Sequence, residues 1–178
     1  FHELVSTRAD AVATASGIRP EISGVLRRSS GDFEEILAGS DLIVELMGGT
    51  DPARAYVLQA LRAKLPVVTA NKQLLAQHGE ELFDAAREAG VQLRFEAAVA
   101  AVIPIVRTIQ ESFGVTEISK VFGIVNGTTN FILSEMAASG VAYGEALARA
   151  QDLGSAEADP TDDVAGLARV RASVGTPI

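Results

Sequence analysis

The first hundred residues alternate between short apolar runs and longer segments whose apolar residues recur at helical spacing. The apolar runs lie at residues 41–47, 66–70 and 91–96, with a shorter one at residues 20–28. The helical segments lie at residues 1–13, 33–38, 52–63 and 74–88. Runs rich in β-branched residues predict buried strands, and the longer segments predict amphipathic helices. The alternation with short loops predicts βαβ units and a parallel sheet.

Residues after Pro104 follow a different order. We expect a helix over residues 105–112, a strand over 118–125, and helices over 131–138, 143–151 and 162–173. A boundary near residues 97–104 would divide the chain into a dinucleotide-binding half, residues 1–100, and an α+β half, residues 101–178. Because residues 1–5 have the pattern of the middle of a helix, we expect the first strand of the dinucleotide fold to precede Phe1.

Composition narrows the class of protein. The chain is 48% hydrophobic, which is enough for a packed core, and 15 basic against 23 acidic residues give a net charge of −8. This charge disfavours nucleic acid and anionic membranes as partners. No apolar run approaches the ~20 residues that span a bilayer, and no signal peptide is visible, so we expect a cytoplasmic protein. The lack of cysteine excludes disulfides and a catalytic thiol.

Residues with chemical potential follow two of the predicted strands. Gly48 and Gly49 end the run at 41–47, and glycines at a strand end let a cofactor approach the backbone. An ordinary turn explains them equally well. Lys72 follows the run at 66–70 and could bond ribose hydroxyls or polarise a carbonyl; the alternative is a solvated lysine. Arg28, in the arginine pair that ends the run at 20–28, favours a 2′-phosphate, although a solvated pair is the simpler interpretation.

Two polar motifs lie in the second half. Residues 126–130 combine glycine, threonine and asparagine, which suits recognition of a carboxylate or hydroxyl, or simply caps the next helix through Thr128 or Thr129. Four carboxylates crowd into the segment that follows Gly154, namely Glu157, Asp159, Asp162 and Asp163. Asp159 before Pro160 is a good helix cap, but capping needs neither Glu157 nor Asp163. These two carboxylates therefore favour a role in holding a cation or a cationic substrate group.

Together these motifs resemble homoserine dehydrogenase. The resemblance rests on residues 45–49, 69–72, 95–97, 124–130 and 157–163, in the order and spacing of that family. Such enzymes interconvert L-homoserine and L-aspartate 4-semialdehyde with NAD or NADP, on the route to threonine, isoleucine and methionine. The resemblance implies an incomplete Rossmann-type parallel sheet followed by part of an α+β substrate and dimerisation domain, and a homodimer in the intact enzyme.

The resemblance also implies roles for single residues. Cofactor contacts would come from Gly48, Gly49, Lys72, Gly154 and Arg28, with Lys72 and Glu157 as the catalytic pair. The amino-acid substrate would be held by Gly127, Thr128, Glu157 and Asp163. A sodium ion would be bound by Glu96 with the carbonyls of Val99, Ala101 and Ile103.

This chain departs from the family's pattern at several positions. Ala101 and Val102 stand where glycines are usual, and Ser155 where a tyrosine is usual. Ala168 and Ala172 occupy the positions of the family's substrate-binding Asp and general-acid Lys. We therefore expect a partial chain with weak or no activity of its own. The alternatives are a non-catalytic relative that binds an amino acid or dimerises, and a Rossmann-type dehydrogenase for another small acid.

Overall fold

The first half of the chain is built on a small parallel sheet. The computed structural model describes residues 1–100, 103–124 and 126–156. The strands are β1 (Ile43–Glu45), β2 (Val67–Thr69) and β3 (Leu93–Arg94), in the order β1-β2-β3 and all parallel. Their register aligns Ile43, Val67 and Leu93, which are all buried. The predicted α/β class and parallel sheet are thus confirmed, with strands shorter than the apolar runs.

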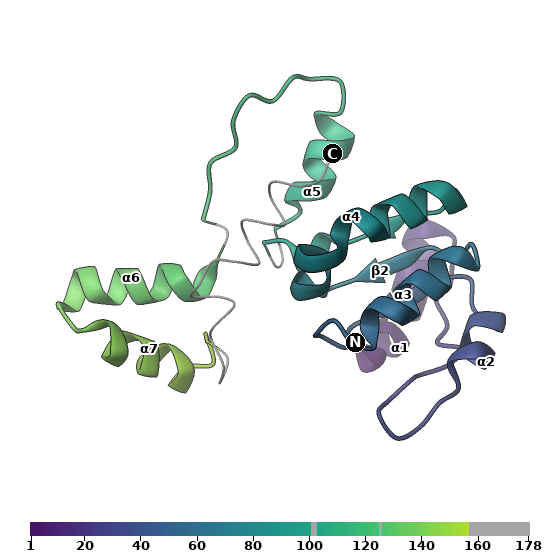
Figure 1. The fold of residues 1–178 in the computed structure, drawn as a ribbon, viewed down its shortest axis with the longest axis horizontal. Helices are drawn as coiled ribbons and strands as arrows, with labels where there is room; N and C mark the ends of the chain where they lie inside the picture. Colours follow the sequence, from purple (N-terminus) through teal and green to yellow (C-terminus); the bar gives the residue numbers. More distant parts are fainter. Residues whose placement is uncertain (101–102, 125, 157–178) are drawn as a thin grey trace.

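Two helices connect the strands and cover one face of the sheet. They are α3 (Ala53–Arg62) and α4 (Lys72–Ala89), which lie side by side in front of β2 in Figure 1. Val57, Leu61, Leu74 and Leu82 are almost completely buried between these helices and the sheet. The periodic apolar positions of both helices therefore supply the main core, as the helical spacing predicts.

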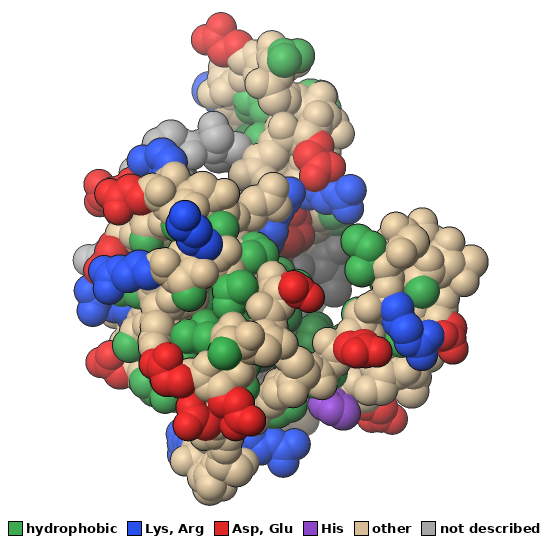
Figure 2. Space-filling view, turned by 90° about the vertical axis from the view of Figure 1, so that its right-hand side faces the viewer, with side chains coloured by type: hydrophobic (Ala, Val, Ile, Leu, Met, Phe, Trp, Pro, Cys, Tyr) green, Lys and Arg blue, Asp and Glu red, His purple; other side chains and the backbone are tan. Residues whose placement is uncertain are grey.

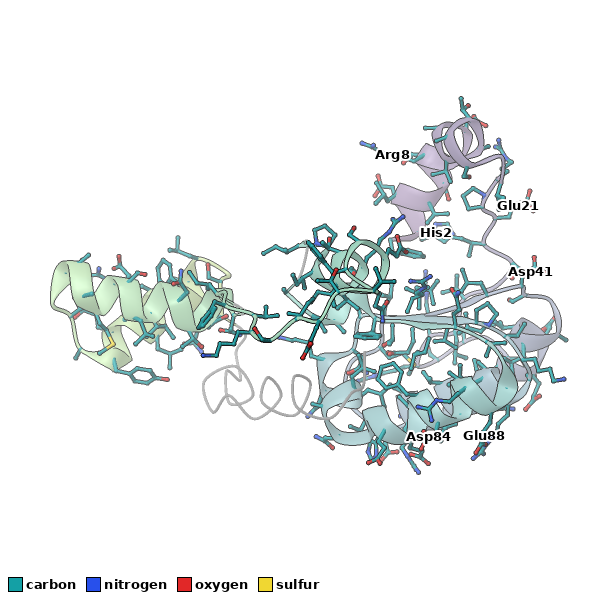
Figure 3. The ribbon with its side chains drawn as sticks, turned by 90° about the horizontal axis from the view of Figure 1, so that it is seen from above. His2, Arg8, Glu21, Asp41, Asp84 and Glu88 are labelled. Atoms are coloured by element: carbon teal, nitrogen blue, oxygen red, sulfur yellow. The ribbon has the colours of Figure 1, made fainter. Side chains whose placement is uncertain are left out.

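The other side of the sheet faces α1 (His2–Ser16). Figure 3 places this helix, with His2 and Arg8, on the opposite side of the sheet from Asp84 and Glu88 of α4. Ala9 is the buried residue of α1, while Leu4 and Val12 stay exposed. The helix therefore adds little to the core.

The short helix α2 (Phe33–Ala38) joins the edge of this half. Asp32 caps it by accepting hydrogen bonds from the N–H groups of Glu34 and Glu35, at 2.8 and 3.3 Å. The ring of Phe33 packs against Tyr56 of α3, with ring centroids 4.4 Å apart. This contact fixes α2 beside the helical layer.

The second half contains helices without strands among its described residues. A 3₁₀ turn η1 (Glu96–Ala98) follows β3, and α5 (Ile105–Arg107) continues into the π-helical turn η2 (Thr108–Ser112). Helices α6 (Gly127–Ser139) and α7 (Tyr143–Asp152) then pair around Ile132, Ala146 and Ala150. Figure 1 shows this pair apart from the sheet, beyond the extended segment 113–124.

Two predicted strands are wrong, and among the described residues neither segment pairs with a neighbouring strand. Residues 20–28 form no strand; a turn brings Arg27 back to Ser30 in an isolated antiparallel bridge. Residues 118–124 also form no strand and leave Val121, Phe122 and Ile124 exposed, while residue 125 lies outside the described part. A β-rich sequence becomes a strand only where its backbone groups find a ladder partner.

The predicted start of α3 also needs correction. The helix predicted from residue 52 begins at Ala53, and Pro52 precedes it without a side-chain cap. The N–H of Arg54 donates to the carbonyl of Thr50, at 2.8 Å. A backbone turn thus begins the helix in place of a side-chain cap.

The surface is mixed in character. Figure 2 shows acidic and basic side chains interspersed on one face, with hydrophobic side chains visible between them. Within residues 1–100, 103–124 and 126–156, no helix combines the length and apolar character that a membrane span requires.

Candidate active site

The carboxyl ends of the three parallel strands meet at one edge of the sheet. Gly48 and Gly49 follow β1, Asn71 and Lys72 follow β2, and Glu96 follows β3. In open parallel sheets ligands bind outside this edge. The topology therefore brings the first group of predicted site residues to the place where a cofactor would be expected.

The glycine loop has a backbone that suits close approach by a ligand. Gly48 and Gly49 have φ angles of 73° and 70°, a region that residues with a side chain rarely adopt. A Cβ at either position would meet no atom within 4 Å, so the space beside the loop is open. The backbone of this loop is therefore open to close approach by a ligand.

Asn71 joins this loop to the start of α4. Its Oδ1 accepts a hydrogen bond from the N–H of Leu74 at 3.0 Å and so caps the helix. Its Nδ2 donates to the carbonyl of Gly49 at 2.7 Å. Lys72 is consequently the first residue of α4, directly after the residue that contacts the glycine loop, and its side chain is exposed.

Glu45 is a residue of this edge that sequence reasoning missed. It is 4% exposed, and its Oε1 accepts a hydrogen bond from the N–H of Met47 at 2.7 Å. Its Oε2 accepts from the hydroxyl of Thr69 at 2.6 Å, and Thr69 Oγ1 accepts from the N–H of Asn71 at 3.0 Å. The sequence signal was a carboxylate inside an apolar run, two positions after Ile43 and on the same face.

A second group of predicted site residues gathers at the ends of α6 and α7. The hydroxyl of Thr128 donates to the carbonyl of Ser155 at 2.6 Å, although the two residues are 27 positions apart. Gly127 begins α6, and Gly154, with φ 69°, directly precedes Ser155. The structure thus brings Gly127, Thr128 and Gly154 together at the α6–α7 pair. Figure 1 shows this pair apart from the sheet.

Asn126, rather than either threonine, supplies the side-chain cap of α6. Its Oδ1 accepts a hydrogen bond from the N–H of Thr129 at 2.7 Å. The capping alternative for Thr128 and Thr129 is therefore wrong. Thr128 is buried, with its hydroxyl turned to the segment that follows α7.

Glu96 has a structural role in this fold. Its two carboxylate oxygens accept hydrogen bonds from the N–H groups of Val106 and Arg107, at 3.0 and 2.8 Å. A carboxylate at the start of a helix is stabilised there without any cation. Val99 and Ile103 lie on the connecting loop, and Ala101 lies outside the described residues. The described residues contain no cluster of three or more acidic or histidine side chains that could hold a metal.

Several predicted residues remain outside the two groups. Arg28 lies in the exposed turn between Arg27 and Ser30. Glu157 and Asp163 fall outside the described residues, as do Val102, Ala168, Ala172 and the predicted helix over 162–173. Their roles stay predictions.

An ion pair joins α3 to α4. Arg54 binds Glu81 through two hydrogen bonds of 2.7 and 2.6 Å. These bonds lower the pKa of Glu81 below its ordinary value and raise the pKa of Arg54. A hollow of about 750 Å³ beside this pair is lined mainly by polar and charged side chains, including Arg62, His78 and Asp84. Its lining contains none of the glycine-loop or Lys72 residues.

Comparison with known proteins decides the family. The family model described as the NAD binding domain of homoserine dehydrogenase matches residues 20–96, and the model described as homoserine dehydrogenase matches residues 104–173. The chain belongs to the homoserine dehydrogenase family. The glycine loop, Lys72 and Glu45 fall in the first match, and Thr128 and Gly154 fall in the second.

Curated homoserine dehydrogenases show the extent of the likeness. The chain is 51% identical to the enzyme of Bacillus subtilis over 131 residues, which is 74% of this chain and 30% of the relative. It is 54% identical to the enzyme of Corynebacterium glutamicum over 126 residues, which is 71% of this chain and 28% of the relative. The chain thus spans about 30% of the length of these curated relatives.

Solved structures of homoserine dehydrogenases share the fold. The structure from Thiobacillus denitrificans matches with a TM-score of 0.73 and 38% identity, covering 95% of this chain and 41% of that one. A hyperthermophilic archaeal homoserine dehydrogenase, solved in complex with NADPH, matches with a TM-score of 0.70 and 26% identity. The match covers 93% of this chain and 52% of that one. Comparisons of both sequence and structure therefore show that this chain has the Rossmann-type fold of homoserine dehydrogenases.

Proposed function

We propose that this chain is part of an NAD(P)-dependent homoserine dehydrogenase that interconverts L-homoserine and L-aspartate 4-semialdehyde. The observation that carries the proposal is the pair of matches in one chain, one to an NAD binding domain and one to the family's following domain, with Gly48, Gly49 and Lys72 at the ligand-binding edge. The reaction would oxidise the homoserine hydroxyl to an aldehyde and release its proton. The nicotinamide of the bound cofactor would accept the hydride.

The first group of site residues would hold the cofactor. The open backbone of Gly48 and Gly49 would lie against it, because no side chain fills the space beside these residues. Lys72 would bond a ribose hydroxyl or polarise the reacting carbonyl oxygen, since an ammonium at this edge supplies up to three donors. Gly154 would approach the cofactor from the second group.

The second group would hold the amino acid. Gly127 and Thr128 would bind the substrate, together with Glu157 and Asp163, whose carboxylates suit the ammonium group of homoserine. The spacing of these acids in the sequence supports this role. Lys72 and Glu157 would form the catalytic pair when both groups meet around the ligands.

Finer features of the proposal rest on the family resemblance. Four of these features stay predictions: a sodium ion at Glu96, a homodimer, a place in threonine, methionine and isoleucine biosynthesis, and a cytoplasmic location. Arg28 favours NADP over NAD, because an arginine beside the adenosine ribose can pair with a 2′-phosphate.

Lys72→Met tests the proposal in the 178-residue chain. Removing a charge-assisted contact should weaken NADPH binding about tenfold or more, measured by NADPH fluorescence titration and by the ligand-induced shift in melting temperature. Lys72→Arg keeps a cation and should lose less. Lys64→Met is the matched control, since Lys64 is an exposed lysine at the amino end of β2 and not at its carboxyl end.

Turnover and binding should separate in this chain. We expect NADPH and homoserine binding with little or no hydride transfer, because Ala168 and Ala172 stand in place of an Asp and a Lys. Steady NADPH-dependent reduction of aspartate semialdehyde would contradict the expected low activity. A wild-type chain that shows no response to millimolar NADPH would contradict the proposed cofactor site.

A further inference from the structure

We propose that Glu45 is a positioning residue that locks the Gly48–Gly49 loop to the Asn71–Lys72 turn, so that the two loops at the cofactor edge move as one unit. The proposal rests on the proposed function only for the identity of the ligand. The connection between the two loops runs through the buried side chains of Glu45, Thr69 and Asn71.

The register of the sheet creates this connection. Glu45 and Thr69 are paired residues of β1 and β2, so their side chains leave the same face of the sheet side by side. The carbonyl of Glu45 also accepts a hydrogen bond from the N–H of Ala70 at 3.2 Å. Glu45, the last residue of β1, is therefore hydrogen-bonded to the end of β2 through both its backbone and its side chain.

The carboxylate reaches from this pair to both loops. One oxygen accepts from the N–H of Met47, directly before the glycines, and the other accepts from Thr69, whose hydroxyl oxygen accepts from the N–H of Asn71. Asn71 closes the circuit by donating to the carbonyl of Gly49. Each donor in this circuit has an acceptor, and loosening one loop leaves a buried polar group of the other unpaired.

A core residue with a purely structural role would not need a buried carboxylate. Glu45 lies on the face that α3 and α4 cover, where Ile43, Val67 and Leu93 fill the neighbouring positions with apolar side chains. Burying a carboxylate there is less favourable than burying an apolar side chain of similar volume, while its directional bonds fix geometry. The geometry that it fixes is the spacing between the two loops proposed to hold the cofactor.

Three variants test the lock through amide hydrogen exchange in the 178-residue chain. Glu45→Gln keeps the shape but replaces one acceptor by a donor, and Thr69→Val removes the hydroxyl that relays to Asn71. Thr69→Ser retains that hydroxyl and is the matched control. We expect exchange to rise about tenfold at Met47, Asn71 and Leu74 in the first two variants, as for the loss of one buried hydrogen bond, and to stay near wild type in Thr69→Ser.

The amides of α3 distinguish a lock from general destabilisation. They should keep their wild-type exchange in Thr69→Val, because their bonds do not involve the circuit. Equal acceleration in α3 and in the loops would overturn the proposal, and so would acceleration at Met47 alone with Asn71 and Leu74 unchanged. If Glu45→Gln fails to fold, the Thr69→Val and Thr69→Ser pair still decides the question.

Adding NADPH tests the link to function separately. In the wild-type chain NADPH should slow exchange in residues 46–49 and 70–74 together, whereas in Thr69→Val the two segments should respond unequally. If NADPH has no effect on exchange in the wild type, the proposed cofactor site is contradicted. The exchange rates measured without NADPH then still test the connection between the two loops. Equal protection of both segments in Thr69→Val would overturn the coupling.

Discussion

At the residue scale, the polar side chains of the candidate site bond to backbone groups at element ends. Asn71 bonds the N–H of Leu74 and the carbonyl of Gly49, Glu96 bonds two N–H groups of the α5 region, and Thr128 bonds the carbonyl of Ser155. Each bond fixes a backbone turn next to residues that are proposed to hold a ligand. Changes at these side chains should therefore shift both stability and binding.

Thr128→Val tests how much one such bond contributes to stability. The change keeps the volume of the side chain but removes the donor to Ser155, so we expect a loss of about 1 kcal/mol in the free energy of unfolding of the α6–α7 pair, measured by urea titration. Thr128→Ser retains the hydroxyl and should lose less. A Thr128→Val chain as stable as Thr128→Ser would show that the bond contributes nothing.

Single residues also show where sequence reasoning reaches its limit. Gly48, Gly49 and Lys72 could be placed at the sheet edge because each lies within two residues of the end of an apolar run. The role of Glu45 could not be found in this way, because it depends on a pairing with Thr69, 24 positions away. The register that aligns them is a property of the folded sheet.

At the element scale, helices followed their sequence signals more closely than strands did. The helix over residues 33–38 has the predicted bounds, since its cap at Asp32 and its spacing are local features. The segments at 20–28 and 118–124 have equally clear apolar patterns but form no strands. Helical hydrogen bonds are internal to a segment, whereas a strand needs a partner that the segment itself does not encode.

The ion pair between α3 and α4 gives an element-scale prediction. Because Arg54 lowers the pKa of Glu81, the pair stabilises the folded state above the ordinary carboxyl pKa of 4.5, and this contribution is lost as the pH falls through the lowered value. Glu81→Gln should thus lower the melting temperature at pH 7 by about 1–3 °C, a small shift because the pair is partly exposed.

The difference between Glu81→Gln and wild type should vanish as the pH falls well below 4.5, where the wild-type carboxyl is also neutral. Parallel melting curves from pH 3 to pH 7 measure this. A Glu81→Gln deficit that persists undiminished at the acid end would contradict the electrostatic cause. Glu88→Gln, on the same helix, is a suitable control for a general change in net charge.

At the scale of the whole molecule, the described chain has two separate hydrophobic cores. One lies between the sheet and the α3–α4 layer, and the other joins α6 to α7. The sequence predicted the α/β class and both sets of helices from periodicity. It did not show how far apart the two cores would lie, because that arrangement depends on contacts between distant segments.

Two cores predict two cooperative units of unfolding. Leu61→Ala removes a fully buried side chain from the first core and should destabilise it by about 2–5 kcal/mol, with hydrogen exchange in α6 unchanged. Ile132→Ala should have the reverse effect. Leu4→Ala in α1, where the side chain is 57% exposed, is the control and should shift neither unit by more than about 0.5 kcal/mol.

Uniform acceleration of exchange across both units in either variant would instead indicate a single cooperative fold. The experiment separates the cores without any ligand. It therefore tests the architecture independently of the proposed activity.

The extended segment between the two cores has a consequence for how the protein behaves in solution. Val115 and Phe122 are almost fully exposed there, and the stretch from Ile118 to Ile124 combines β-branched side chains with a single charge, on Lys120. Such a stretch is a template for pairing between molecules and for aggregation as protein concentration rises. A charge inside such a stretch opposes that association, so we expect Lys120 to favour solubility although it follows the glycine loop by some seventy residues.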